Sequence, residues 1–176
     1  MELKYTVTLI GILSDSHDAV GMIEKAVKVL NEQGVELVLA CGDYISPFTV
    51  ARFAKLNCKM VGVFGNNDGD KSTLKERFDE VGFGVTEGPL AMEISNKRVI
   101  IMHGYKNVEV TRAFVESLAE KEIYDIVIYG HTHHVDNRKI GKALVLNPGE
   151  VCGYLTGKST VMVLDIEKME AKVIEL

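Results

Sequence analysis

The stretch Ile126-Val127-Ile128-Tyr129-Gly130-His131-Thr132-His133 decides how the rest of the chain is interpreted. Four apolar residues predict a buried strand, and the chain then turns at a glycine and presents two histidines one residue apart. Side chains at positions i and i+2 of an extended segment point the same way, so both imidazoles are expected to face one spot. Because imidazole is a common metal ligand, this spot is a candidate metal site.

Further apolar runs predict more strands, and apolar residues at helical spacing predict helices between them. The strands are expected at residues 7–13, 35–41, 59–64, 90–94, 97–102, 126–129, 143–146, 159–166 and 171–174, with 90–94 and 97–102 paired as a hairpin. The helices are expected at 19–33, 70–80 and 108–121, with a fourth from Ser46-Pro47 to about Asn57. The segment from Val135 to Gly141 is interpreted as a variable loop.

Each predicted helix carries an apolar stripe that is expected to face the core. The stripes are Val20, Ile23, Val27 and Leu30; Phe48, Ala51 and Leu56; Leu74 and Phe78; and Val110, Phe114 and Leu118. Helices alternate with strands in the first half of the chain, whereas the tail is nearly all strand. This order favours an α/β fold of two packed sheets with helices outside them over one doubly wound sheet.

Length, charge and cysteine content narrow the class of protein. A chain of 176 residues is expected to form one domain, residues 1–176, and its net charge of -5 gives no bulk attraction to nucleic acid or anionic membranes. Cys41, Cys58 and Cys152 form no disulfide framework and no CxxC pair. The sequence shows no signal-peptide pattern and no apolar run near the ~20 residues of a membrane span, so a cytoplasmic location is expected.

Polar side chains follow the predicted strands at the point where each strand ends. They are Asp15, His17, Asp43, Asn66, His103, His131 and His133. Four of the five histidines in the chain fall in these places, and strand ends on one edge are where α/β proteins assemble ligand sites. Carboxylate, imidazole and amide oxygen without thiolate suit Mn, Fe, Ni, Zn or Mg. Seven ligands are too many for one ion but suit two ions that share a carboxylate.

The motifs Asp15-x-His17, Gly42-Asp43, Gly65-Asn66, His103 and Gly130-His131-x-His133 together resemble those of the binuclear (calcineurin-like) metallophosphoesterase superfamily. They occur in the same order over most of the chain, and the small YfcE-type prokaryotic phosphodiesterases are the branch that the chain resembles most. The resemblance implies a four-layer αββα sandwich of two mixed sheets flanked by helices. It also implies a metal-dependent phosphoric ester hydrolase.

By the same resemblance, each candidate ligand has an expected role. Asp15, His17 and His133 would bind one metal, Asn66, His103 and His131 would bind the other, and Asp43 would bridge them. Two divalent ions, with Mn²⁺ first and Ni²⁺, Fe²⁺ or Zn²⁺ as alternatives, would acidify a bridging water so that its hydroxide attacks a phosphodiester. His131 and His133 would then serve different ions.

One residue departs from the pattern of the superfamily. The ligand asparagine is commonly followed by a histidine that assists the leaving group, and here that position is Asn67. An amide can hydrogen-bond a phosphate but cannot donate a proton at neutral pH, so Asn67 is expected to contact the phosphate only. This predicts a preference for diesters with acidic leaving groups.

The alternatives are a phosphomonoesterase and a catalytically silent scaffold, as in the retromer subunit of the same fold, which loses site histidines. The expected substrate is a small phosphoester, with nucleotide-derived esters included, no membrane partner is expected, and a homo-oligomer stays open. Among neighbouring residues, His134 is expected in solvent, Asp18 as a helix N-cap and Asp68 as a residue that orients a ligand or the loop. Asn147-Pro148-Gly149-Glu150 is expected to form a tight turn.

Overall fold

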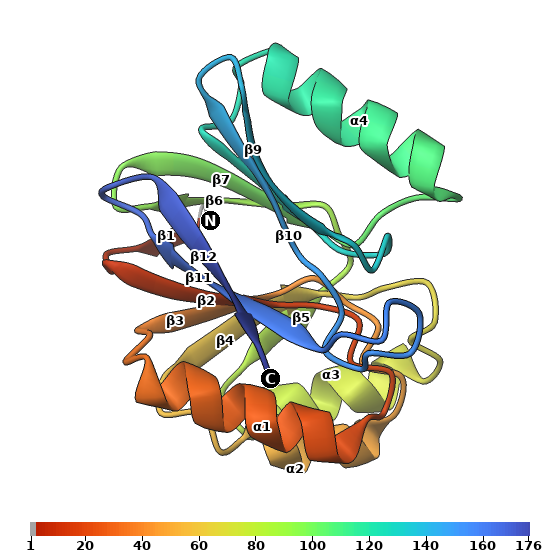
Figure 1. Cartoon of the computed structure of the whole chain (residues 1–176). Coiled ribbons are helices and arrows are strands. Elements are labelled where there is room, and N and C mark those ends of the chain that lie inside the picture. Colours follow the sequence, from red (N-terminus) through yellow and green to blue (C-terminus); the bar gives the residue numbers. More distant parts are fainter. Residues whose placement is uncertain (1–2) are drawn as a thin grey trace.

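Two six-stranded sheets lie face to face in the computed structural model of the chain, which describes residues 3–176 (Figure 1). Met1 and Glu2, which belong to the expected domain at residues 1–176, lie outside the described residues. One sheet has the order β1 (Lys4–Tyr5), β6 (Leu90–Ile94), β7 (Lys97–Met102), β8 (Ile126–Tyr129), β10 (Ala143–Pro148) and β9 (Val135–Ile140). The other has the order β12 (Glu170–Glu175), β11 (Thr160–Asp165), β2 (Leu9–Leu13), β3 (Leu37–Ala40), β4 (Lys59–Val63) and β5 (Gly84–Thr86).

Helices cover the two outer faces, as Figure 1 shows. The helices are α1 (Val20–Glu32), α2 (Val50–Phe53) after the 3₁₀ turn η1 (Pro47–Thr49), α3 (Lys71–Glu80) and α4 (Val108–Glu120). The first three pack on the sheet that contains β2, and α4 packs on the sheet that contains β8. Parallel and antiparallel neighbours occur in both sheets. The predicted four-layer αββα sandwich of mixed sheets is therefore confirmed.

Alternation along the strands divides the core into layers. Ile10 and Ile12 of β2 and Ile126 and Ile128 of β8 are fully buried between the two sheets. Leu13 points to the opposite side and packs with α1. Because both faces of these strands are covered, almost all of their residues are apolar. Such continuous apolar runs are visible in the sequence, so these strands could be predicted from it.

The apolar stripe predicted for α4 is wrong at Val110 and Phe114, whereas its third residue, Leu118, is partly buried and packs against the core. The residues of α4 that are buried against the sheet are Thr111, Val115 and Ala119, whereas Val110 and Phe114 remain 38% and 46% exposed. The helix carries apolar side chains on two neighbouring faces, and the smaller side chains face the sheet. Smaller residues allow the helix to approach the strands closely, so packing against the sheet rather than periodicity selects the buried face.

Two other elements differ from the prediction. The segment expected as a loop from Val135 to Gly141 contains strand β9, which pairs antiparallel with β10. Its side chains are largely exposed, so it shows no apolar signal. The helix after Ser46 is a 3₁₀ turn followed by one α-helical turn, and Phe48, which was expected in the core, is 86% exposed.

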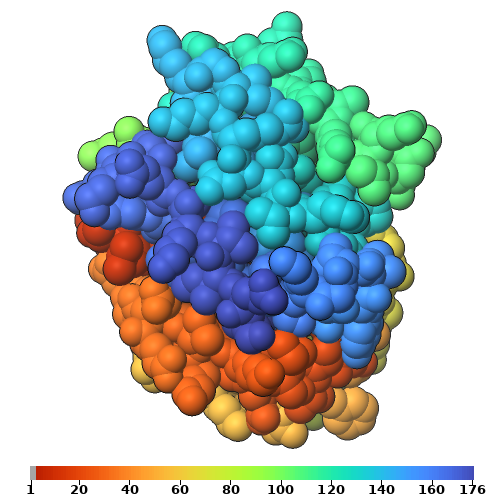
Figure 2. Space-filling view, in the orientation of Figure 1, coloured from red at the N-terminus to blue at the C-terminus, as the bar shows by residue number. Residues whose placement is uncertain are grey.

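Figure 2 shows how distant segments meet on one face of the molecule. The C-terminal residues, in dark blue, lie between the orange N-terminal region and the cyan segment that includes β9. The green residues of α4 stand at the edge of the molecule. None of the helices in the described part of the chain is long and apolar enough to span a membrane.

Candidate metal centre

Five strands from both sheets deliver the predicted ligands to one edge of the molecule. Asp15 and His17 follow β2, Asp43 follows β3, Asn66 follows β4, His103 follows β7, and His131 and His133 follow β8. Strands β2, β3 and β4 are parallel to one another, as are β7 and β8, so their carboxyl ends coincide. All seven predicted ligands therefore converge at this edge.

The loops that carry these residues have unusual backbone dihedrals. Asp15, His17, Asp43, His131 and His133 all have φ between 42° and 66°. Non-glycine residues adopt this left-handed region rarely, and such strain concentrates at functional sites. The expectation that the two histidines after β8 lie on an extended segment is wrong, because the strand ends at Tyr129 and the chain turns sharply.

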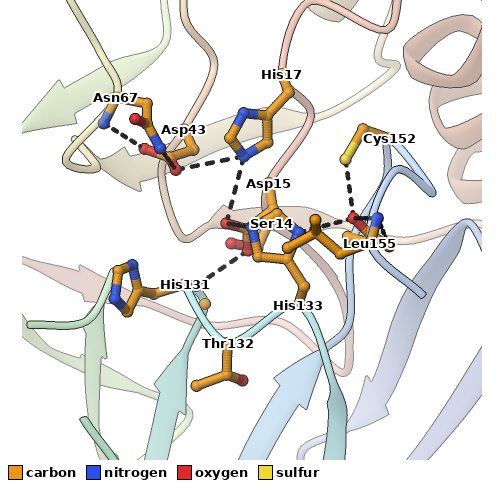
Figure 3. A network of polar contacts seen from close by, with 12 residues as sticks. Ser14, Asp15, His17, Asp43, Asn67, His131, Thr132, His133, Cys152 and Leu155 are labelled. Atoms are coloured by element: carbon orange, nitrogen blue, oxygen red, sulfur yellow. Dashed lines mark hydrogen bonds and ion pairs between the residues drawn. The ribbon is translucent and has the colours of Figure 1, made fainter. Parts of the chain in front are cut away.

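The first cluster contains Asp15, His17 and His133. Nε2 of His133 lies 3.4 Å from Oδ1 of Asp15, and Nε2 of His17 lies 3.9 Å from the same oxygen. The two imidazole rings are 5.1 Å apart between centroids, so this contact joins the edges of the two sheets. Figure 3 shows His17 beside both Asp15 and Asp43. These ligand atoms of the first cluster lie within 4.8 Å of one another and could hold a metal ion.

The second cluster contains Asn66, His103 and His131. Nε2 of His103 lies 3.0 Å from Oδ1 of Asn66 and 3.3 Å from Nδ1 of His131. Its ring meets that of His131 edge to face at 5.0 Å.

Asp43 connects the two clusters. Its Oδ2 lies 3.4 Å from Nε2 of His17 and 3.3 Å from Nε2 of His103. The carboxylate is 1% exposed and accepts two hydrogen bonds from Asn67, at 2.8 Å from the backbone N–H and 2.7 Å from the side-chain amide. Gly65 makes this approach possible, because a Cβ at that position would overlap the Asp43 carboxylate.

Hydrogen bonds at the rear of two rings decide which nitrogen faces the site. Nδ1 of His103 lies 2.6 Å from the Cys41 carbonyl oxygen, and Nε2 of His131 lies 3.0 Å from the Lys106 carbonyl oxygen. A carbonyl oxygen only accepts, so each of these nitrogens carries the proton and donates it. The other nitrogen of each ring presents a lone pair to the site. Metal-binding histidines are commonly held in this way.

The charges at the centre perturb one another. The Asp15 carboxylate raises the pKa of His17, although burial opposes the increase. Burial lowers the pKa of His103, but its hydrogen bond and charge interaction with Asp43 outweigh this and raise it. Burial likewise opposes ionisation of Asp43, yet His103 and the hydrogen bonds from Asn67 hold the pKa of that carboxyl far below its usual range. Asp43 is therefore ionised at neutral pH.

Two buried atoms of the first cluster test whether a cation fits here. Among the described residues, Oδ1 of Asp15 and Nε2 of His17 are buried without a hydrogen-bond partner. An unsatisfied buried carboxylate oxygen is costly, and a cation at this position would satisfy it. The oxygen and nitrogen donors, without a thiolate, suit a divalent metal of intermediate hardness. The residues present therefore fit a metal ion.

Asp68 and Asn147 support the loops from behind. Asp68 accepts hydrogen bonds from the backbone N–H groups of Asp43 at 3.1 Å, Gly65 at 2.7 Å and Ile45 at 2.8 Å, so it orients the loop as expected. Asn147 donates to the Gly130 carbonyl at 3.0 Å and to Thr132 Oγ1 at 3.0 Å. These bonds fix the turns that carry Asp43 and His131.

Two polar residues, Asp18 and His134, lie next to the ligands in the sequence. Asp18 is not a helix N-cap, because that position is Ala19; its carboxylate accepts from the backbone N–H and hydroxyl of Ser46 at 3.1 and 2.8 Å. His134 is exposed, as expected, and its Nδ1 lies 2.6 Å from the Thr132 carbonyl.

Glu150 is the residue that sequence analysis missed. Its fully buried carboxylate lies 2.7 Å from Nδ1 of His133 and also accepts from Cys152, Leu155 and Thr156. Burial opposes its ionisation, but these hydrogen bonds lower the pKa of Glu150 to about 2. Asn147-Pro148-Gly149-Glu150 was expected to form a tight turn, but Asn147 and Pro148 belong to strand β10 and pair with β9. The signal for the role of Glu150 was an acidic residue just after β10, a strand parallel to β8.

Comparison with known proteins identifies the family. The model of the calcineurin-like phosphoesterase superfamily domain matches residues 9–169. The chain belongs to this superfamily. A phosphodiesterase of Methanocaldococcus jannaschii is 39% identical to this phosphoesterase over 168 residues, which are 95% of this chain and 98% of that protein. The prediction of a phosphoric ester hydrolase is thereby confirmed.

Solved structures share the fold of this phosphoesterase. An archaeal phosphodiesterase superimposes with a TM-score of 0.88 at 38% identity, covering 96% of this chain and 99% of that one. Vps29 of Chaetomium thermophilum gives 0.71 at 16% identity, covering 96% of each chain. Yfce, a phosphoesterase from E. coli, gives 0.65 at 17% identity, covering 94% and 98%. The last two likenesses show the fold alone.

Proposed function

We propose that this chain is a divalent-metal-dependent phosphodiesterase that uses two ions held by the clusters on either side of Asp43. The observation that supports this best is the position of Asp43, whose Oδ2 lies within 3.4 Å of a ring nitrogen from each cluster. A buried carboxylate between two sets of acceptor atoms suits two cations that share one ligand. The identity shared with the archaeal phosphodiesterase supports the choice of a diester.

The seven predicted ligands divide into two sets in this proposal. Asp15, His17 and His133 would hold one ion; Asn66, His103 and His131 would hold the other; and Asp43 would contact both. Two divalent ions would supply Lewis-acid charge to the phosphoryl group and lower the pKa of a water molecule. Manganese is the first candidate, and nickel, iron and zinc suit the same donor atoms.

The chain's own residues prepare the site for an anionic ester. With two divalent ions, the carboxylates of Asp15 and Asp43 leave a positive formal charge, which attracts a phosphodiester despite the acidic chain. Asn67 directs its amide and its backbone N–H at Asp43, so its first role is to orient that carboxylate. An amide cannot donate a proton to the leaving group. We therefore propose diesters with acidic leaving groups, nucleotide-derived esters included, as substrates.

Metal removal and replacement test the proposal. Purified protein is stripped of metal and assayed with bis(4-nitrophenyl) phosphate and with 4-nitrophenyl phosphate, after Mn²⁺, Ni²⁺, Fe²⁺, Zn²⁺ or Mg²⁺ is added singly. We expect activity to return with a transition metal and to favour the diester. A preference for the monoester would indicate a phosphomonoesterase, and no hydrolysis with any metal bound would indicate a scaffold.

A pair of histidine variants tests the ligand assignment. His103→Ala removes a buried ring between Asp43 and Asn66 and should lose most of the activity and of the metal bound. His134→Ala removes an exposed ring from the same loop as His133 and should change neither. Full activity of the His103→Ala protein would contradict the assignment.

We also propose a cytoplasmic location, because the free thiols of the chain suit a reducing compartment.

A further inference from the structure

A cavity of about 740 Å³ lies beside the second cluster of the candidate metal centre. Asn66 and His103 form part of its wall, so the cavity and the cluster share two side chains. Its size falls in the range of roughly 300–1,000 Å³ typical of small-molecule sites. A phosphate bound at the cluster would have this space next to it for one of its ester groups.

The cavity is bordered by apolar side chains that the core does not use. Val110 and Phe114 lie one turn apart on α4, on the face beside the one buried against the sheet, and both line the cavity. They are 38% and 46% exposed, and Tyr105, before the same helix, is 61% exposed. Exposed apolar groups gathered at one concave place are typical of binding surfaces.

Two buried side chains and one ion pair also line this cavity. Phe64, directly after β4, and Met102, at the end of β7, line it and are 7% and 5% exposed, so both are closely packed. At the rim, Nζ of Lys71 lies 5.7 Å from the centroid of the Phe64 ring and 3.1 Å from Glu87. Lys71 and Glu87 form an ion pair at the rim, and most of the other side chains that line the cavity are apolar. An ester with an apolar, planar group matches this lining.

We propose that this cavity binds a planar aromatic group esterified to the phosphate, so that the preferred substrates are aryl or nucleoside diesters. This inference rests on the proposed function, because the phosphate itself is assigned to the metal centre. Three aromatic rings, of Phe64, Tyr105 and Phe114, surround the space from separate segments. Ring-to-ring contact is favourable beyond area burial, which selects an aromatic group over an alkyl one.

Binding of non-hydrolysable phosphonates to the manganese-loaded protein tests the inference by calorimetry. Phenylphosphonate and methylphosphonate carry the same anionic head and differ in the group that would enter the cavity. We expect phenylphosphonate to bind at least about tenfold more tightly, the ratio expected if the cavity removes about half of the ring from water. A second pair, adenosine 5′-monophosphate and ribose 5-phosphate, distinguishes a nucleobase from a simple aryl group.

Variants of exposed residues show whether the cavity causes the difference. Phe114→Ala should reduce the phenyl-to-methyl ratio to about that of two equal ligands, and Phe114→Tyr, which keeps the ring, should retain it. Ile123→Ala is the matched control: Ile123 is 52% exposed, lies beyond the end of α4 and does not line the cavity. Circular dichroism verifies that each variant is folded, which is expected because these side chains lie on the surface.

The outcomes separate this inference from the function on which it rests. A phenyl preference that Phe114→Ala abolishes and Ile123→Ala preserves supports the inference. Equal binding of both phosphonates, or a preference that survives Phe114→Ala, overturns the aromatic cavity and leaves the metal-centre proposal intact. No binding of either phosphonate with metal present overturns both.

Discussion

Replacement of Glu150 by glutamine should weaken metal binding by changing the proton position on His133. In the native protein, Oε2 of Glu150 lies 2.7 Å from Nδ1 of His133. A carboxylate only accepts, so Nδ1 carries the proton and Nε2, on the side of Asp15, keeps its lone pair. A glutamine has the same shape but presents one NH₂ group, which must lie at the position of either Oε1 or Oε2.

The surrounding donors decide which position the NH₂ group takes. The Leu155 N–H is shared between Oε1 and Oε2 at 3.0 and 3.2 Å, whereas the Thr156 N–H donates to Oε1 alone at 2.6 Å and cannot become an acceptor. Oε2 faces the His133 ring, which can exchange its proton between its two nitrogens. The NH₂ group is therefore expected at the Oε2 position, where it donates to Nδ1 of His133 and moves the ring proton to Nε2.

The expected effect follows from loss of that lone pair. A protonated Nε2 cannot bind a cation, so metal binding requires the ring to return to the less favourable tautomer. Changes to the group behind a ligand histidine typically cost about 10- to 100-fold in metal affinity, or about 1.4–2.7 kcal/mol. We expect Glu150→Gln to lie within this range, with a comparable loss of activity at limiting metal.

Two measurements and one control test this prediction. Calorimetric titration with Mn²⁺ gives the affinity, and long-range ¹H–¹⁵N NMR of the metal-free protein reports which nitrogen of His133 carries the proton. Thr156→Val removes a hydroxyl that donates to Oε1 at 2.8 Å and leaves the His133 contact in place. It should cost about 1 kcal/mol of stability and leave metal affinity unchanged. Native affinity in Glu150→Gln, or a proton that stays on Nδ1, would refute the reasoning.

Three further predictions concern stability and loop geometry. Hydrogen bonds and charge from Arg98 lower the pKa of Asp125, so their contribution is present above about pH 4 and is lost as the pH falls through the lowered pKa. Asp125→Asn, discounted for solvent screening, should therefore cost about 1 kcal/mol at pH 7 and almost nothing near pH 2, measured by urea unfolding. Gly65→Ala places a methyl group on the Asp43 carboxylate and should abolish Mn²⁺ binding in calorimetry, whereas retained binding would show that the loop can move. Phe78→Ala removes a fully buried ring and should lower the free energy of unfolding by about 3–5 kcal/mol, and a loss below 1 kcal/mol would contradict the described core.

Local patterns in the sequence located most elements of the fold correctly. Strand β8 and the β6–β7 hairpin were predicted with the bounds that the structure gives, and Asn107 caps α4 by accepting from the Val110 N–H. These features depend on periodic burial and on side-chain to backbone bonds within a few residues. Such information is contained in a short stretch of sequence.

The sequence of α4 alone could not show which of its two apolar faces is buried against the sheet. Val110 and Phe114 have the spacing of core residues, but the sheet accepts the neighbouring face of α4 and leaves these two beside the cavity. Strand β9 gave no apolar signal because its residues are largely exposed, and it is a strand through its pairing with β10. Both outcomes depend on which surfaces meet in the folded chain.

The sequence by itself determined which residues meet at the candidate centre, because each follows a strand and parallel strands end at a common edge. Only the tertiary structure decided how they meet. His131 contacts His103 and His133 contacts Asp15, and both histidines have left-handed backbone, which alternation along a strand does not predict. The contact between Glu150 and His133 joins the ends of β10 and β8, and its distance and donor direction exist only once these two strands are paired in the sheet.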